Sequence, residues 1–195
     1  MFERKTDYPI HALIKNRWSP RAMTGEEMTD EEIFPLFEAA RWAPSCYNNQ
    51  PWRFLYAKRN TPHWDKFFAL LVDFNKKWCV NAALLGVIVG KKNFERNGKF
   101  SVTYALDTGS AWENLALEGA GRGLVVHGMG GFDYEKAKST LHVPDDHEVL
   151  AMFAVGKKAP LESLPEDLRK EEISRDRKKI GDFIFEGGFR YTARD

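Results

Sequence analysis

Two short, continuous apolar runs constrain the fold of this chain more than any other feature. They are LLGVIVG at residues 84–90 and VLAMFAVG at residues 149–156. Apolar runs without polar alternation are typical of strands that are buried on both faces. The segment WRFLYAK at 52–58 alternates aromatic with other residues and predicts another strand, and LVVH at 124–127 is also strand-like. The sequence therefore predicts a small central sheet.

Helical patterns surround these strands. Residues 29–32 (TDEE) have the form of a capping box, and Ile33, Leu36, Phe37 and Ala40 then recur at helical spacing. This predicts a helix from about Asp30 to Trp42, which Pro44 ends. Further helices are predicted at about 9–15, 62–74 and 108–122, and one beginning at Asp133. We expect a helix-rich α+β fold in one domain that covers residues 1–195.

The composition narrows the class of protein. The chain has 195 residues, 43% of them hydrophobic, which is enough for one core without disulfides. Its 29 basic and 28 acidic residues are balanced, so neither nucleic acid nor an acidic membrane is expected as a partner. Cys46 and Cys79 are too few for a disulfide framework, no metal-site spacing occurs, and no apolar run could span a bilayer. We expect a cytoplasmic protein.

Two basic groups could bind an anion. In RWSPR at 17–21, the side chains of Arg17, Ser19 and Arg21 would project to one side of an extended chain, which suits a phosphate dianion. Taken alone, a solvated turn is the favoured interpretation. The second group, Arg175 to Lys179, is by default a solvated charged face. The two groups gain meaning only if the fold brings them together.

Two loops contain more polar side chains or more glycines than a simple turn needs. The stretch RWAPSCYNNQPWRF at 41–54 places Ser45, Asn48, Asn49 and Gln50 between two elements that both look buried. The stretch GMGGF at 128–132 has three glycines, which let backbone N–H groups approach a ligand closely. A tight turn is the alternative, but it would need fewer glycines. Neither GxGxxG nor a P-loop motif occurs.

The sequence offers no clear catalytic side chain. Cys46 could be a thiol nucleophile with His127 as its base, but a small half-buried cysteine and a hydrogen-bonded structural histidine are the favoured interpretations. An enzyme without a dedicated acid, base or nucleophile usually takes its chemistry from a cofactor. We therefore expect a cofactor to carry the reaction.

Several motifs in order resemble one family along nearly the whole chain. They are RWSPR, EAARWAPSCYNNQPWRF, FNKKW, DTGSAWENLALEGAGRGLVVHGMGGFD and RDRKKIGDFIFEGGF. Together they resemble the FMN-dependent nitroreductases. The resemblance implies an α+β fold with a mainly antiparallel central sheet flanked by helices, in an intertwined homodimer with FMN at the interface. It also suits the C-terminal segment, about 172–195, which carries apolar bulk in IGDFIFEGGF after a charged run and which we expect to pack on the partner subunit.

The resemblance implies a set of FMN contacts. The phosphate and ribityl chain would meet the two basic groups, and the flavin ring would be lined by the polar stretch, partly from the partner subunit, by an asparagine and by the glycine stretch. The residues that match are Arg17, Trp18, Ser19, Arg21, Pro44, Ser45, Cys46, Asn48, Gln50, Asn75, Met129, Gly130, Gly131, Arg175 and Arg177. Many relatives have a second serine where this chain has Cys46.

The resemblance implies an oxidoreductase with a ping-pong cycle. NADH or NADPH would deliver hydride to flavin N5, and a nitroaromatic or quinone acceptor would then be reduced, with no essential acid among the side chains. Two alternatives stay open. One is a specialised flavin enzyme on the same scaffold, such as a reductive dehalogenase, although the extra substrate lid of such enzymes is not evident in the sequence. The other is a flavin-binding or storage module with little turnover.

Overall fold

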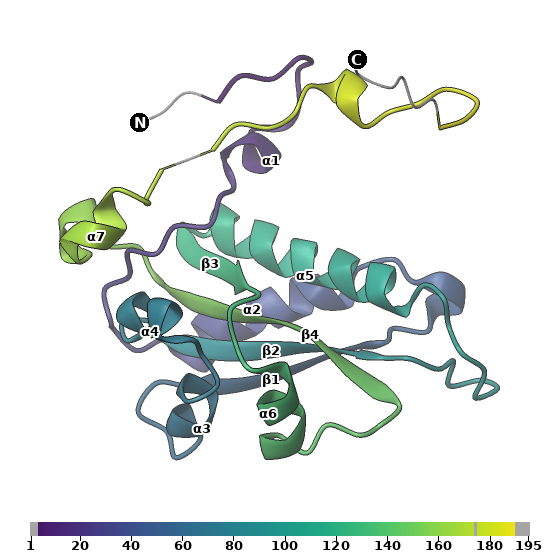
Figure 1. Cartoon of the computed structure of the whole chain (residues 1–195), viewed down its shortest axis with the longest axis horizontal. Helices are drawn as coiled ribbons and strands as arrows, with labels where there is room; N and C mark the ends of the chain where they lie inside the picture. The colour runs from purple at the N-terminus through teal and green to yellow at the C-terminus, as the bar shows by residue number, and fades with distance from the viewer. Residues whose placement is uncertain (1–3, 174, 190–195) are drawn as a thin grey trace, which may run out of the picture.

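The fold is built on a four-stranded antiparallel sheet. In this computed structural model, which describes residues 4–173 and 175–189, the strands lie in the order β1-β2-β4-β3 (Figure 1). Their bounds are Trp52–Lys58 for β1, Leu84–Lys91 for β2, Leu124–Met129 for β3 and His147–Lys157 for β4. β1 and β3 are therefore the edge strands. The predicted α+β fold with a small central sheet is confirmed.

The two continuous apolar runs form the central strands. β2 and β4 pair antiparallel with Leu84 opposite Val155, and each has a further strand on its outer side. Successive residues of β2 belong to different cores, since Leu84 packs on one face and Leu85 on the other. A strand with both faces buried has no need of polar alternation, which is why these runs are uniformly apolar.

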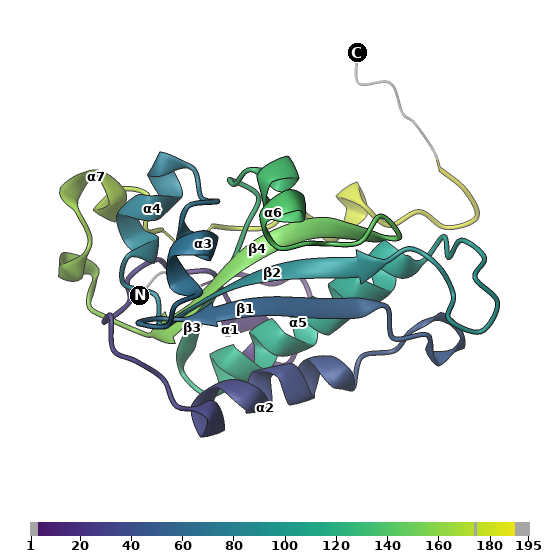
Figure 2. The same ribbon diagram turned by 90° about the horizontal axis from the view of Figure 1, so that it is seen from below.

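Helices cover both faces of the sheet (Figure 2). On one face lie α2, Asp30–Arg41, and α5, Tyr104–Gly121. On the other lie α3, Trp64–Phe68, α4, Asp73–Cys79, and α6, Tyr134–Thr140. The remaining short elements are α1 (Ala12–Asn16), η1 (Cys46–Asn48), η2 (Leu161–Ser163), α7 (Glu166–Arg169) and η3 (Ile180–Asp182).

Helix starts follow local sequence where a cap is present. α2 begins as predicted, because the Thr29 backbone N–H donates to Glu32 Oε2 at 2.8 Å and closes the capping box. α6 begins after Asp133, whose side chain accepts from the Lys136 N–H at 2.9 Å. α5 has no side-chain cap and begins at Tyr104, four residues before the predicted start at Thr108.

The predicted single helix at 62–74 is wrong. Two short helices, α3 and α4, occupy this region, and residues 69–72 between them are not helical. The backbone there pairs with the segment that follows β3: the Asp133 N–H donates to Leu70 O at 2.9 Å, and the Val72 N–H donates to Gly131 O at 3.2 Å. These long-range bonds replace the helical bonds that local sequence favours.

The C-terminal segment leaves the compact body after α7. In Figure 1 it is yellow and runs beside the N-terminal segment, away from the sheet. One contact between the two is the Ile180 N–H, which donates to Asp7 Oδ2 at 3.2 Å. Phe183, Ile184 and Phe189 are exposed on it. Across the described residues, no helix combines the length and apolar character that crossing a membrane requires.

Candidate functional site

The fold brings the two basic groups of the sequence together. A cavity of about 290 Å³ is lined by Arg17, Trp18, Ser19 and Arg21 from the first group and by Arg175 and Arg177 from the second. Arg4, His127, Glu171, Glu172 and Ile173 complete its wall. Five arginines against two glutamates leave this wall with an excess of positive charge. The condition for reading the two groups as one anion site is therefore met.

Arg21 fastens the first group to the C-terminal segment. Its guanidinium lies 3.3 Å from Glu172 Oε2 and donates to the Glu171 carbonyl at 3.0 Å. Its backbone N–H also donates to Glu172 Oε1, at 2.5 Å. The Glu172 side chain is only 5% exposed, so this ion pair is shielded from water. Arg21 therefore joins the two halves of the cavity and already has a counter-charge.

Two more arginines of the cavity, Arg4 and Arg17, lie side by side, and a third, Arg175, lies 3.6 Å from the exposed Glu171. Arg4 donates to the carbonyls of Lys15 at 2.8 Å and Arg17 at 2.6 Å, which holds it beside Arg17. Burial lowers the pKa of Arg4, and the neighbouring charges of Arg177 and Arg17 lower it further. Arg17 has one carboxylate nearby, Glu113, at 3.5 Å. A cluster of guanidiniums that repel one another is stabilised by a bound anion.

His127 connects the cavity to the sheet. It lies on β3, and its Nδ1 is 2.9 Å from the carbonyl oxygen of Pro20, in the RWSPR stretch. Because a carbonyl only accepts, Nδ1 carries the hydrogen. The ring packs against Trp78 with centroids 4.6 Å apart, and burial lowers the pKa of His127. His127 is thus hydrogen-bonded, as the structural interpretation predicted. The same hydrogen bond also holds the RWSPR stretch against β3.

The glycine stretch follows on the same strand. Gly130 is exposed at the end of edge strand β3, while Met129 is buried. A strand advances about 3.3 Å per residue, so Gly130 lies roughly 10 Å from His127. A Cβ at Gly131 would come within 2.8 Å of Asn75 Nδ2, so only glycine fits there. The cavity and the glycine stretch therefore lie along one edge of the sheet.

Asn75 supports the glycine stretch from α4. Its Nδ2 donates to the Gly131 carbonyl at 2.9 Å, and its Oδ1 accepts from Trp78 Nε1 at 3.3 Å. The side chain is buried. Its position follows from the break between α3 and α4, because that break lets Val72 and Asn75 approach Gly131.

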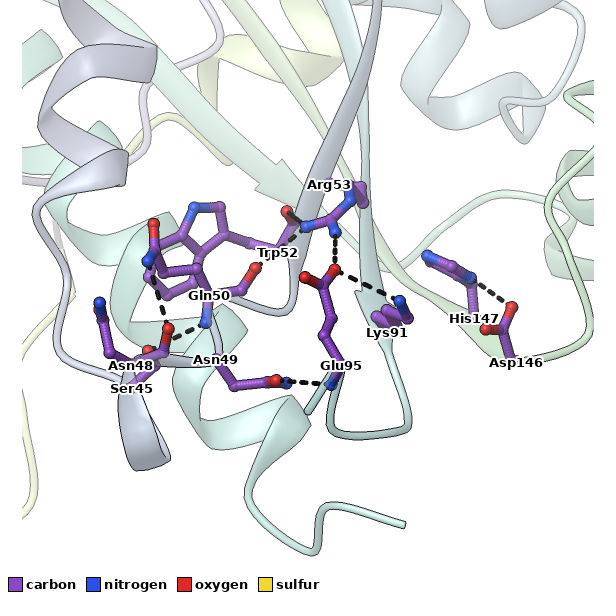
Figure 3. Close-up of polar contacts among 10 residues, drawn as sticks. All are labelled: Ser45, Asn48, Asn49, Gln50, Trp52, Arg53, Lys91, Glu95, Asp146 and His147. Carbon is purple, nitrogen blue, oxygen red and sulfur yellow. Dashed lines mark hydrogen bonds and ion pairs between the residues drawn. The ribbon is translucent and has the colours of Figure 1, made fainter. Parts of the chain in front are cut away.

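Residues 45–50, which we call the amide loop, have a strained backbone that is held by local hydrogen bonds, some of which are drawn in Figure 3. Tyr47, Asn48 and Gln50 all have positive φ, at 52°, 54° and 47°. The Gln50 N–H donates to Ser45 Oγ at 3.0 Å, and Gln50 Nε2 donates to the Asn48 carbonyl at 3.2 Å. Three residues in this conformation need such local bonds to hold them.

The start of α5 anchors the amide loop. The Cys46 N–H donates to Asp107 Oδ2 at 3.0 Å, and Thr103 Oγ1 donates to the same oxygen at 3.2 Å. Pro44, before the loop, is exposed, and so is the Asn48 side chain. No hydrogen bond of the Asn48 side-chain amide is found in the part of the chain that the structure describes. The loop therefore presents polar groups to the exterior.

The amide loop and the arginine cavity are separate within one chain. The loop leads into β1 at one edge of the sheet, whereas the glycine stretch ends β3 at the other edge. Three interstrand steps of about 4.8 Å put these edges roughly 14 Å apart. Residues 44–50 are all described, and none of them lines the cavity. The sequence therefore identified the arginine groups and the amide loop as candidate site residues. Within one chain, the structure brings the two arginine groups together but leaves the amide loop apart from them.

The cysteines do not form a nucleophilic or metal site. Cys79 is buried, and its burial raises the pKa of the thiol. Its sulfur lies 3.6 Å from the Met129 sulfur, in the core. Cys46 is half-buried. Among the described ranges 4–173 and 175–189, no group of three or more metal-ligating side chains could hold a metal ion.

Sequence and structure comparisons agree on one family. The model of the nitroreductase family matches residues 14–77 and 69–157 of the chain. A solved structure described as an oxidoreductase containing FMN superposes with a TM-score of 0.91 at 37% sequence identity, and the match covers 96% of each chain.

Two curated proteins are also similar. A 15.4 kDa uncharacterised protein of Mycolicibacterium smegmatis is 30% identical over 99 residues, which are 51% of this chain and 64% of that relative. This chain thus spans less than two thirds of that protein's length. A protein of Streptomyces coelicolor, named provisionally as an NADH dehydrogenase/NAD(P)H nitroreductase, is 21% identical over 167 residues, covering 76% of this chain and 84% of its own.

Proposed function

The chain belongs to the nitroreductase family, and from this we propose that it is an FMN-dependent oxidoreductase that uses NADH or NADPH to reduce a nitroaromatic or quinone acceptor. The observation that carries the proposal is the arginine cavity, in which two basic groups from opposite ends of the chain meet. The FMN described in the relative with 37% identity supports it. The name of the Streptomyces relative supports the nicotinamide donor.

The residues of the cavity fit the phosphate of FMN. A phosphate monoester carries roughly two negative charges near neutral pH, and guanidiniums bind it through charge-assisted hydrogen bonds. The carboxylate that pairs with Arg21, Glu172, is buried, whereas those near Arg17 and Arg175, Glu113 and Glu171, are exposed to water. We therefore assign the phosphate to Arg17, Arg175 and Arg177, with the Ser19 hydroxyl as a further donor. Trp18 would lie against the ribityl chain. These assignments need no basic surface elsewhere on the protein.

FMN supplies the redox chemistry when it is bound, taking hydride at N5 from NADH or NADPH and passing electrons to the acceptor in ping-pong order. The chain's own part is to orient and stabilise it. Gly130 is exposed just after the edge strand β3, so a backbone N–H of the stretch 129–131 can face the ring. Asn75 keeps this backbone in place. Fixed N–H dipoles of this kind stabilise negative charge on a reduced ring.

We infer that a second copy of the chain completes each site. The amide loop lies at the other edge of the sheet from the glycine stretch, so the ring edge would meet Ser45, Asn48 and Gln50 of the partner subunit. The exposed Phe183, Ile184 and Phe189 suit the same homodimer, with the C-terminal segment of about 172–195 packed on the partner. Residues 174 and 190–195 of this segment lie outside the described residues. On this proposal the whole chain is one FMN-binding domain that works as a dimer.

Flavin content tests the cavity. The double variant Arg17→Ala/Arg177→Ala should purify with little or no FMN, measured by visible absorbance against protein concentration. The matched control is Arg41→Ala/Arg122→Ala, which removes two exposed arginines that pair with Glu38 and Glu118. The control should retain the wild-type flavin content. A yellow Arg17→Ala/Arg177→Ala protein with full FMN would show that the phosphate binds elsewhere.

Turnover separates the proposed enzyme from the alternatives. Anaerobic addition of NADH or NADPH should bleach the flavin absorbance, and a nitroaromatic or quinone should restore it within the turnover time. Bleaching without reoxidation by any such acceptor would favour a flavin-binding or storage module. Reoxidation by a halogenated aromatic, but not by nitroaromatics or quinones, would favour the dehalogenase-type alternative.

A further inference from the structure

We propose that Arg96, stacked on Tyr47 of the amide loop, binds an anionic group on the small molecule that reacts with the flavin. The inference rests on the proposed function, since it takes the amide loop as the border of the flavin ring. The group is a phosphate or a carboxylate. It is carried by the nicotinamide donor, as the extra phosphate of NADPH, or by an acidic aromatic acceptor.

The first support is the geometry of the arginine. The guanidinium carbon of Arg96 lies over the Tyr47 ring, 3.8 Å from its centroid, and 5.5 Å from the centroid of Phe94. The rings of Tyr47 and Phe94 meet edge to face at 5.9 Å. Stacking holds a guanidinium by its flat face and leaves the N–H groups at its edge available. We call these three residues the arginine shelf.

The second support is the charge balance around the shelf. Glu95 is the acidic residue next to Arg96, but it lies 3.0 Å from Arg53 and 3.3 Å from Lys91. The pKa of Glu95 is lowered by its hydrogen bond to Lys91 and by the charges of Lys91 and Arg53. Glu95 is therefore a carboxylate that forms ion pairs with those two cations. Arg96 forms no ion pair within residues 4–173 and 175–189. Its charge is therefore available to an external anion.

The third support is a set of hydrogen bonds that joins the segment next to Arg96 to the amide loop (Figure 3). The Glu95 backbone N–H donates to Asn49 Oδ1 at 3.0 Å, and Arg53 donates to the Gln50 carbonyl at 3.0 Å. Figure 3 shows Glu95 between Arg53 and Lys91, with Asn49 pointing to its backbone. The segment that carries Arg96 is thus fixed to the loop expected at the ring.

Tyr47 places the arginine shelf at the surface of the molecule. It is 71% exposed and has a φ of 52°, a conformation that few residues other than glycine adopt. A backbone held in this conformation directs the ring away from the core and places it under Arg96. Backbone strain of this kind persists where the surrounding structure fixes it, as the Ser45 and Asp107 hydrogen bonds do here.

The test compares two variants, each of which removes one positive charge from the same segment. Arg96→Gln loses the stacked cation, while the control Lys99→Gln loses an exposed cation on the same segment that stacks on no aromatic ring within the described residues. Flavin content is measured first. The donor arm then compares NADPH with NADH using the neutral quinone menadione, and the acceptor arm compares 4-nitrobenzoate with neutral 4-nitrobenzyl alcohol using NADH.

In at least one arm, the wild type should favour the compound with the additional anionic group, which is NADPH over NADH or 4-nitrobenzoate over 4-nitrobenzyl alcohol. Arg96→Gln should lower kcat/KM for that compound by about tenfold, the effect of one lost charge-assisted contact, and change kcat/KM for the other compound of the same arm by less than about twofold. Lys99→Gln should change both by less than about twofold. The affected arm identifies whether donor or acceptor carries the anion, and the difference should shrink in high salt.

Three results would overturn the inference while leaving the proposed function intact. The first is a flavin-loaded wild type that does not prefer the compound with the additional anionic group in either arm. The second is a ratio of kcat/KM between the two compounds of an arm that Arg96→Gln leaves unchanged. The third is an equal loss in Lys99→Gln. A wild-type protein that binds no FMN, or that NADH and NADPH do not reduce, would instead overturn the proposed function itself.

Discussion

His127 is a half-buried residue that joins the RWSPR stretch to the central sheet. Its Nδ1–H donates to the Pro20 carbonyl, and Arg17, Arg21 and Glu172 are the charged groups that act on it. Burial is the largest influence on its pKa and lowers it below the ordinary value of 6.5. The unfolded chain therefore takes up this proton at a higher pH than the folded chain does.

This sets the sign of a pH effect. The pKa of His127 is lower in the folded chain than in the unfolded chain. Above about pH 6.5 the residue is neutral in both states, so it does not change the free energy of unfolding. Below that pH the unfolded chain binds the proton more readily, so acidification lowers the free energy of unfolding. We expect His127→Gln to reduce the drop in unfolding free energy between pH 7.5 and pH 5.5, measured by urea denaturation. His63→Gln, which removes an exposed histidine, serves as the control. An unchanged drop in His127→Gln would contradict this account.

The two cysteines should differ sharply in reactivity. Cys79 is buried in the core, and the raised pKa of its thiol keeps it protonated near neutral pH. In the variant Cys46→Ser, we expect no rapid reaction with a thiol reagent such as dithionitrobenzoate in the native state, and one thiol per chain after unfolding. Rapid labelling of the native Cys46→Ser protein would mean that Cys79 is accessible.

At the level of elements, the packing of α5 on β3 depends on a glycine. A Cβ at Gly119 would lie 2.3 Å from the Cγ2 atom of Val126, a stiff side chain on β3. A Cβ at Gly121, in the same helix, would meet Leu13 at an ordinary 3.7 Å. The helix therefore tolerates a methyl group at one glycine and not at the other.

Alanine substitutions at these two positions make a matched pair. We expect Gly119→Ala to lower the free energy of unfolding by about 1–3 kcal/mol, since Val126 and the strand must shift. Gly121→Ala should leave it unchanged or raise it by up to about 1 kcal/mol through helix propensity. Equal effects in chemical denaturation would show that α5 and β3 do not pack as described.

The elements also show how far the sequence predicts the fold. β1 begins and ends at the predicted residues, and α2 begins where its capping box stands, because both depend on local patterns. The break between α3 and α4 could not be predicted, since it depends on bonds from Leu70 and Val72 to a segment far along the chain. Local sequence is informative only where the competing contacts are local too.

The candidate site divides in the same way. Arg17, Ser19 and Arg21 are a recognisable group in the sequence, but their meeting with Arg175 and Arg177 required the fold. Glu172 was not predicted, because a glutamate in a charged segment gives no sign that it will be buried against Arg21. Arg4 was missed for a similar reason. Its place in the cavity follows from two backbone carbonyls, which the sequence does not mark.

At the scale of the whole molecule, the exposed tail predicts self-association. Phe183 is 60% exposed in the single chain, and Phe185 is 41% exposed. We expect Phe183→Ser/Phe185→Ser to weaken the dimer by at least about tenfold, measured by sedimentation or light scattering across concentrations. The control Phe34→Ser removes an exposed phenylalanine from α2. A dimer of unchanged strength would exclude these tail residues from the interface.

The separation of the amide loop from the arginine cavity has a genetic consequence. If each site draws its arginines from one chain and its loop from the other, a chain with Arg17→Ala/Arg177→Ala and a chain with Asn48→Ala/Gln50→Ala are each defective alone. A heterodimer of the two contains one site with both parts intact and one with neither. Co-expression of the two defective chains should therefore restore up to about half of the wild-type activity per mixed dimer, as complementation between two alleles of a single gene.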